Sequence, residues 1–197
     1  MAKQYDALDA RLRSFIGRQR IFFTASAAPM SGDGSGGEVS RVNVSPRPTD
    51  CLRVLSDNAV CYLDRTGSGN ETAAHARAGG NTTVMFCAVE GPPLILRLYG
   101  VATIHPHGTP DYDALFAMHY DEEPLGTRQI VRLDFDLVQT SCGYGVPLFA
   151  YGGERPSMDN WAEQKIEENG PTALKDYRRE KNARSIDGLP TWIAEEA

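Results

Sequence analysis

The sequence predicts a mainly β protein with flanking helices, an α+β fold class in which the strands close into a barrel or a sandwich. In the middle of the chain, short apolar stretches alternate with polar residues, which is the pattern of half-buried strands. Turn residues rather than long helices separate these stretches, so consecutive strands are expected to pair as antiparallel hairpins. Such sheets bury their apolar face by closing on themselves or by packing face to face.

The N-terminal third predicts one helix followed by strands. Leu8, Leu12, Phe15 and Ile16 recur at helical spacing among charged residues, and Gly17 is expected to end the helix. Four short strands are then expected, over residues 21–27, 38–45, 52–55 and 59–63.

Prolines and glycines mark the ends of these strands. Pro46 and Pro48 are expected to end the second strand, because proline cannot donate to a sheet ladder. Residues 29–37 are rich in glycine, but no Gly-Lys-Ser/Thr follows them. They therefore predict an exposed hairpin loop rather than a phosphate loop.

The stretch from residue 60 to residue 86 holds the strongest candidate for a binding site. An apolar run ends at Leu63, Gly67-Ser68-Gly69 indicates a tight turn, and residues 71–77 are helix formers that Gly79-Gly80 would stop. Glycines permit positive φ, and the backbone N–H groups of such a turn can bind an anion such as a phosphate. An ordinary turn with a short helical connector fits the same residues.

A Rossmann dinucleotide turn is a further interpretation of these glycines, and two observations oppose it. The third glycine position of that motif holds Thr72. Residues 81–89 and 94–104, on either side of Gly91-Pro92-Pro93, predict an antiparallel hairpin instead of a second parallel strand.

The last part of the chain changes character. Helices are expected over residues 113–120, 161–168 and 173–181, and a strand over residues 129–140. Residues 1–147 are therefore expected to form a barrel domain with an N-terminal helix. Residues 148–197 are expected to form a helical arm that packs on the barrel or on a partner subunit. The run Arg178-Arg179-Glu180-Lys181 reads as a solvated helix face.

Composition narrows the functional classes. The chain has 197 residues and a formal net charge of −6, which argues against a general affinity for nucleic acid or for anionic membranes. No apolar run reaches membrane-spanning length, and the first residues lack the form of a signal peptide. The 4 cysteines show no Cys-x-x-Cys spacing, so they are expected to be buried free thiols in a reducing cytoplasm.

Four segments carry a family resemblance. They are the strand from Arg41 to Arg47, the strand, turn and helix from Tyr62 to Arg77, and the strands over residues 82–89 and 94–103. Together they resemble the pyridoxamine 5′-phosphate oxidase-like family of flavin-binding split β-barrels, over roughly residues 10–140. In that family FMN lies at the interface of a homodimer, so the resemblance implies a split barrel, FMN as cofactor and a homodimer.

The resemblance also implies a set of FMN-binding residues. On the strand they are Arg41, Val42, Asn43, Ser45 and Arg47; on the turn they are Asp64, Thr66, Ser68, Gly69, Asn70 and Thr72. The oxidase has an adjacent Arg-Lys pair in this turn, where the present chain has glycine and serine. Backbone N–H groups and hydroxyls would then hold a phosphate, with positive charge supplied by Arg41, Arg47, Arg65 or Arg97.

The resemblance implies an FMN-dependent oxidoreductase that exchanges hydride with a small substrate, whose identity the sequence does not give. No catalytic residue can be assigned, and no metal site is expected, since His105-Pro106-His107 lacks a third ligand. The tail from Ser185 to Trp192 does not reproduce the arginine-containing segment of the true oxidase, which argues against vitamin B6 synthesis. The alternatives are a non-catalytic flavin- or haem-binding protein, a deazaflavin-dependent reductase of the same fold, and a dimeric scaffold with an empty site.

The stretch from Cys142 to Pro147 admits two interpretations. Gly143 and Gly145 could let the backbone approach a flat ligand on which Tyr144 stacks. The same glycines could equally form a turn that redirects the chain into the C-terminal arm. The sequence leaves the two interpretations equal.

Overall fold

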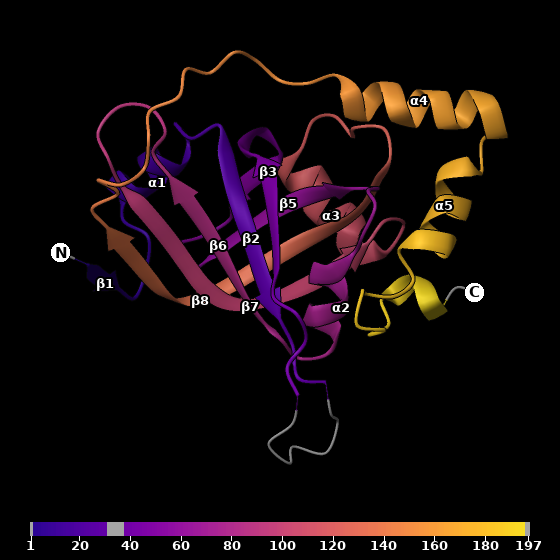
Figure 1. The fold of residues 1–197 in the computed structure, drawn as a ribbon, viewed down its shortest axis with the longest axis horizontal. Coiled ribbons are helices and arrows are strands. Elements are labelled where there is room, and N and C mark those ends of the chain that lie inside the picture. Colours follow the sequence, from indigo (N-terminus) through magenta and orange to yellow (C-terminus); the bar gives the residue numbers. More distant parts are fainter. Residues whose placement is uncertain (1, 31–37, 196–197) are drawn as a thin grey trace.

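A computed structural model describes residues 2–30 and 38–195 (Figure 1). Most of the glycine-rich loop predicted over residues 29–37 lies outside the described residues. The described chain forms one curled, antiparallel sheet with helices around it. This arrangement confirms the predicted mainly β fold class: a half-barrel with flanking helices.

The sheet has eight strands in the described residues, and seven of them follow the order β3-β2-β6-β7-β8-β5-β4, with β1 paired to β8. All of the pairs between strands are antiparallel. The strands are β1 (Lys3–Tyr5), β2 (Ile21–Ala27), β3 (Asn43–Pro48), β4 (Leu52–Val54), β5 (Ala59–Arg65), β6 (Asn81–Cys87), β7 (Ile95–Pro106) and β8 (Thr127–Ser141).

The sheet curls where β7 meets β8. The register between these strands shifts at Tyr99 and Gly100, which is a β-bulge. A Cβ atom on Gly100 would lie 2.0 Å from the carbonyl oxygen of Asp134, so only glycine lets the two backbones come this close. The bulge therefore bends the longest strand pair of the sheet.

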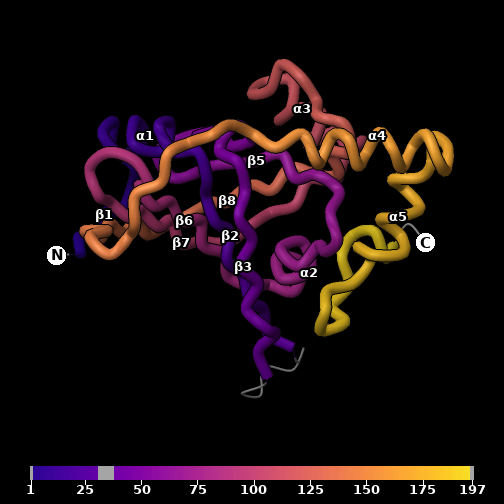
Figure 2. Tube along the Cα trace, turned by 45° about the horizontal axis from the view of Figure 1, so that its top comes forward, coloured from indigo at the N-terminus to yellow at the C-terminus, as the bar shows by residue number. Residues whose placement is uncertain are grey.

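The helices cover the ends and one flank of the sheet. They are α1 (Ala10–Ile16), α2 (Glu71–Arg77), α3 (Pro110–His119), α4 (Ser157–Asn169) and α5 (Ala173–Lys181), with 3₁₀ turns η1 (Thr49–Cys51) and η2 (Trp192–Glu195). Helix α2 packs against β2, β6 and β7. Both views place α5 and the chain that follows it beside α2 (Figures 1 and 2). Within the described residues, no helix has the length and apolar character needed to cross a bilayer.

The core lies inside the curl of the sheet. Strand β5 contributes an uninterrupted buried run from Ala59 to Asp64. Phe22 packs between Tyr62 and Phe86, with ring centroids 5.4 and 5.8 Å apart. A strand buried on both faces can end in a polar residue only if that residue finds partners inside the protein. Asp64, the last buried residue of β5, is such a residue.

Two local predictions were wrong. Strand β3 does not end before its prolines but runs through Pro46 to Pro48, and it begins only at Asn43. Prolines are tolerated there because β3 is the edge strand of the sheet and pairs only with β2. The cysteines are all free, but only Cys61 is buried and Cys142 is exposed, so the expectation that all of them are buried does not hold.

Candidate functional site

The predicted strand, turn and helix are confirmed. Strand β5 ends at Arg65, and α2 spans Glu71–Arg77 as expected. We call the connection between them, residues 66–70, the glycine turn. Neither Gly67 nor Gly69 has a positive φ, so left-handed backbone does not shape this turn. The turn is therefore held by contacts with other parts of the chain.

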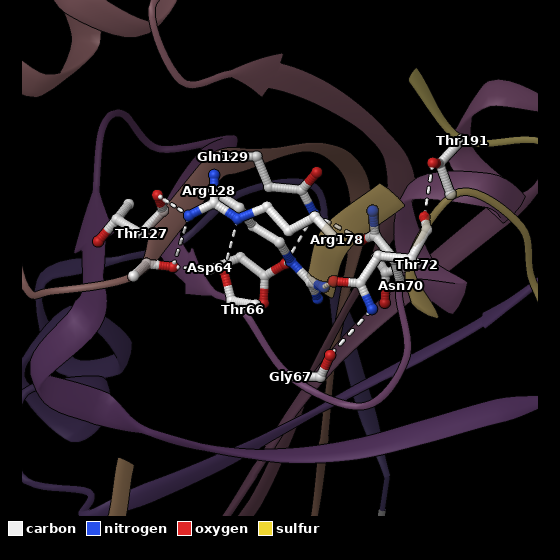
Figure 3. Close-up of polar contacts among 12 residues, drawn as sticks. Asp64, Thr66, Gly67, Asn70, Thr72, Thr127, Arg128, Gln129, Arg178 and Thr191 are labelled. Carbon is white, nitrogen blue, oxygen red and sulfur yellow. Dashed lines mark hydrogen bonds and ion pairs between the residues drawn. The ribbon is translucent and has the colours of Figure 1, made fainter. Parts of the chain in front are cut away.

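The centre of the site is the buried carboxylate of Asp64. Its side chain is 1% exposed and pairs with the guanidinium groups of Arg47 and Arg128. Gln129 Nε2 donates to the same carboxylate at 2.6 Å and to Asn70 Oδ1 at 2.9 Å. We call Arg47, Asp64, Arg128 and Gln129 the Asp64 cluster; Figure 3 shows Arg128 and Gln129 beside Asp64.

The Asp64 cluster contains more positive than negative charge. Burial by itself would raise the pKa of Asp64, but the positive charges of Arg128 and Arg47 and the hydrogen bonds that Asp64 accepts lower it below its usual value. Asp64 is therefore ionised at neutral pH. Neither arginine pairs with a second carboxylate among the residues described, so the cluster has an excess of one positive charge. A buried excess charge favours the binding of an anion nearby.

The glycine turn offers hydrogen-bond donors next to this charge. The backbone N–H groups of Ser68 and Gly69 have no acceptor within the described part of the chain. Ser68 is exposed, whereas Thr66 and Asn70 on either side are 1% and 2% exposed. The turn thus carries at least these two free N–H groups, at an exposed and a half-buried residue, between buried neighbours.

The strand residues of the predicted site fall into two groups. Asn43, Ser45 and Arg47 face the site: Asn43 Nδ2 donates to Thr72 Oγ1 at 3.4 Å, and Ser45 Oγ donates to Asn43 Oδ1 at 3.2 Å. Val42, just before the strand, is 68% exposed. The structure therefore joins the polar residues of β3 to the start of α2 but leaves Val42 outside this group.

The other arginines expected to supply charge point elsewhere. Arg41 donates through its backbone N–H and its guanidinium to Asp187, and these contacts lower the pKa of the Asp187 carboxyl. Arg65 donates to the carbonyl of Leu125 and to Asp159. Of the predicted arginines, Arg47 is the one that reaches the Asp64 cluster.

The C-terminal arm, residues 148–195 of the described chain, supplies partners that sequence reasoning missed. Asn182 Nδ2 donates to the carbonyl of Gly67 at 2.9 Å, and Trp192 Nε1 donates to Gln129 Oε1 at 2.6 Å. Arg178 Nε donates to Thr66 Oγ1 at 2.7 Å, so the prediction that Arg178 lies on a solvated helix face was wrong. No local pattern marks these residues, because each contact joins segments far apart in the sequence.

The stretch after β8 is a turn. Gly143 has a φ of +70°, and a Cβ atom there would lie 2.8 Å from the backbone nitrogen of Leu94. The close approach that this glycine permits is therefore to the chain itself. Tyr144 is 82% exposed. These contacts favour the turn over a ligand-stacking site.

Three of the hollows on the described surface lie away from the glycine turn. One of about 430 Å³ lies between α1 and β4, and one of about 640 Å³ is lined by residues of β6, β7 and β8, Tyr99 and Asp134 among them. A third of about 320 Å³ lies between α2, β7 and Trp192. The exposed residue Ser68 places the turn at the open surface of this protomer.

Comparison with known proteins identifies a relative over most of the chain. The chain is 35% identical over 200 aligned positions to the pyridoxamine 5′-phosphate oxidase family protein ustO of Aspergillus flavus, covering 94% of this chain and 76% of the relative. No family model matches the sequence.

Solved structures whose backbone traces partly match this one have low sequence identity to this chain. HupZ of Group A Streptococcus is 16% identical with a TM-score of 0.46, covering 66% of this chain and 91% of HupZ. The FAD binding protein of Mycobacterium smegmatis is 14% identical with a TM-score of 0.45, covering 68% and 96% of the two chains. The identity and coverage of the Aspergillus relative decide the family: the chain belongs to the pyridoxamine 5′-phosphate oxidase family.

Proposed function

We propose that this protein binds FMN as a homodimer in the cytoplasm and acts as an oxidoreductase that exchanges hydride with a small substrate. Membership of the pyridoxamine 5′-phosphate oxidase family supports a flavin as the cofactor. Family membership does not specify FMN among the flavins, and it does not specify the redox reaction. Support for both has to come from the site itself.

The observation that carries the proposal is the excess positive charge of the Asp64 cluster beside the free N–H groups of Ser68 and Gly69. A phosphomonoester carries about two negative charges and several acceptor oxygens, which matches this combination. Arg47 would supply charge, as a guanidinium that is 17% exposed at the surface. The backbone would supply the directed donors, which explains how the turn can lack an Arg-Lys pair.

The polar residues around the turn fit a ligand with hydroxyl groups between its phosphate and its ring. Asn70 Nδ2 is buried and has no acceptor among the described residues. Asn43 and Ser45 lie on β3 beside Thr72. These residues would hold the phosphate and ribityl parts of FMN. The bound flavin supplies the hydride chemistry, while the protein binds and orients it.

The open surface at the turn is an argument for a site that a second copy of the chain completes. Ser68 of the glycine turn is exposed, and the three hollows described above lie elsewhere, so the ring of a flavin anchored at the turn would be left in solvent. Flavin chemistry benefits from exclusion of water from the reacting ring. A homodimer with the turn at its interface would enclose the ring.

The proposal is tested by the absorbance spectrum of the purified protein, titration with FMN and with riboflavin, and sedimentation. Ser68→Glu places a negative charge on the exposed turn and is expected to weaken FMN at least tenfold while changing riboflavin less than twofold. Ser157→Glu, an exposed serine at the start of α4, adds the same charge away from the site and is the control. Equal losses for both ligands, or no FMN binding by the unmodified protein, would contradict the proposal.

A reduction experiment then separates an enzyme from a carrier. Flavin bleaching by NAD(P)H or by a candidate substrate, with multiple turnovers, supports the oxidoreductase. A bound flavin that no donor reduces would leave a non-catalytic flavin protein.

A further inference from the structure

We propose that Asn182 of the C-terminal arm is a positioning residue for the glycine turn, and that it sets the direction in which the N–H of Ser68 points. The inference rests on the proposed function, because the donor that it positions is the one assigned to the FMN phosphate. It assigns a role in the binding site to an arm that follows the barrel.

The side chain of Asn182 has one possible orientation. Asn182 is 0% exposed, its Oδ1 accepts from Arg128 Nη1 at 2.7 Å, and its Nδ2 donates to the carbonyl of Gly67 at 2.9 Å. Arginine can only donate and a carbonyl can only accept, so exchanging the two amide atoms would break both bonds. The side chain therefore links the Asp64 cluster to the glycine turn through directed bonds.

The bond to Gly67 fixes the next N–H group. The described chain has no cis peptide, so the peptide between Gly67 and Ser68 is planar and trans. In such a peptide the C=O and the N–H point in opposite directions. Since the carbonyl of Gly67 points at Asn182, the N–H of Ser68 points away from it, where it has no acceptor in the described chain.

Asn182 is itself firmly held. Its backbone N–H donates to the carbonyl of Arg178 at 2.8 Å, and its backbone carbonyl accepts from Thr191 Oγ1 at 2.7 Å. Thr191 is also 0% exposed, and the dashed line from its hydroxyl in Figure 3 marks this hydrogen bond within the arm. The other end of the turn is fixed independently, by the bond from the N–H of Thr66 to the carbonyl of Gly126 at 2.8 Å. Loss of the Asn182 side chain would therefore release the Gly67 side of the turn.

Two variants separate the bond to Gly67 from the bond to Arg128. Asn182→Ala removes both bonds and adds no charge. Asn182→Asp keeps an acceptor for Arg128 but sets a carboxylate oxygen against the carbonyl of Gly67, so the peptide is expected to rotate. Asn169→Asp makes the same chemical change on the exposed end of α4 and is the control.

Three measurements are made on each folded variant: FMN affinity, riboflavin affinity, and the backbone amide resonances of Ser68 and Gly69 in the ¹⁵N-labelled, ligand-free protein. We expect both Asn182 variants to bind FMN at least tenfold more weakly, with riboflavin changed less than twofold and both amide resonances shifted. The control Asn169→Asp is expected to keep FMN affinity within threefold. If Asn182→Ala does not fold, the amide resonances of Asn182→Asp carry the test, because the added carboxylate beside Arg128 can weaken FMN binding by its charge alone.

Two outcomes would overturn the inference. One is unchanged FMN affinity in a folded Asn182 variant, and the other is an equal loss for FMN and riboflavin, which would indicate a general structural defect. If the unmodified protein binds no FMN, the proposed function fails by itself. The amide resonances then decide about Asn182: shifts confined to the turn support the positioning role, and unshifted resonances reject it.

Discussion

At the scale of single residues, the site depends on a carboxylate that must stay charged inside the protein. Burying an ion costs several kcal/mol unless partners compensate for the lost hydration. Asp64 obtains this compensation from two arginines and a glutamine amide. Removing its charge would leave Arg128, whose side chain is 4% exposed, without an ionic partner among the described residues.

We expect Asp64→Asn to lower the free energy of unfolding at pH 7 by about 3–5 kcal/mol, as measured by urea denaturation. Asp159→Asn removes the partner of Arg65 at a carboxylate that is 53% exposed, and it should cost no more than about 1 kcal/mol. Equal losses for the two variants would mean that the Asp64 cluster contributes no more than a surface ion pair.

The loss of stability caused by Asp64→Asn is expected to depend on pH. The pKa of Asp64 is lower in the folded protein than the value of about 3.9 for an unfolded aspartate. Its stabilising contribution is therefore complete above about pH 4 and is lost as the pH falls through the lowered pKa of the folded state. The difference in stability between the unmodified protein and Asp64→Asn should be constant from pH 7 to about pH 4 and should shrink below about pH 4. A difference that stays constant below about pH 4 as well would contradict the assignment.

At the scale of elements, turns decide how the sheet continues into the arm. Gly143 combines a left-handed φ with close approach to Leu94, at the point where the chain leaves β8. Gly145, two residues later, has neither a positive φ nor an atom within 4 Å of a Cβ position. Gly145 is therefore a suitable control for a substitution of Gly143.

Gly143→Ala should reduce the free energy of unfolding by at least about 1–2 kcal/mol, because alanine is strained at this φ and its methyl group would meet the backbone of Leu94. Gly145→Ala should change it by less than about 0.5 kcal/mol. Chemical denaturation of both variants under one set of conditions is the measurement. Comparable effects at the two positions would indicate that the turn is not fixed as described.

Elements that carry a local signal could be predicted, and contacts between distant segments could not. Helix α2 was predicted with its observed bounds because helix formers lie between a glycine turn and a glycine pair. The bond between Asp64 and Arg128 spans 64 positions, and that between Gly67 and Asn182 spans 115. Polar residues have no periodicity that would reveal such pairing, so the turn was found and its supports were not.

At the scale of the whole molecule, the free edge of the sheet restricts how a second copy could bind. Strand β3 is the edge strand, and Pro46 and Pro48 remove two N–H donors from it. Such an edge is a poor template for adding another strand. Val42 and Val44 are 68% and 60% exposed, so a homodimer at this face would form through side-chain packing.

We therefore predict that Val44→Glu weakens the proposed homodimer at least tenfold, because the carboxylate would have to lose its hydration in an apolar contact. Sedimentation velocity over a range of protein concentrations measures the effect. Met118→Glu, which changes a side chain of α3 that is 73% exposed, is the control and should leave assembly unchanged. A monomeric parent protein at micromolar concentration would contradict the dimer itself.

The contact of Trp192 with Gln129 has a practical consequence. The chain has two tryptophans; Trp161 packs edge-on against Tyr177 at 5.1 Å on the helical arm, and Trp192 lies next to the Asp64 cluster. Indole emission overlaps the near-ultraviolet absorption of flavins, so a bound flavin would quench the nearer indole more strongly. If the proposed flavin binds at this site, Trp192 would serve as a built-in fluorescent probe of its occupancy, and Trp192→Phe would show which indole reports it.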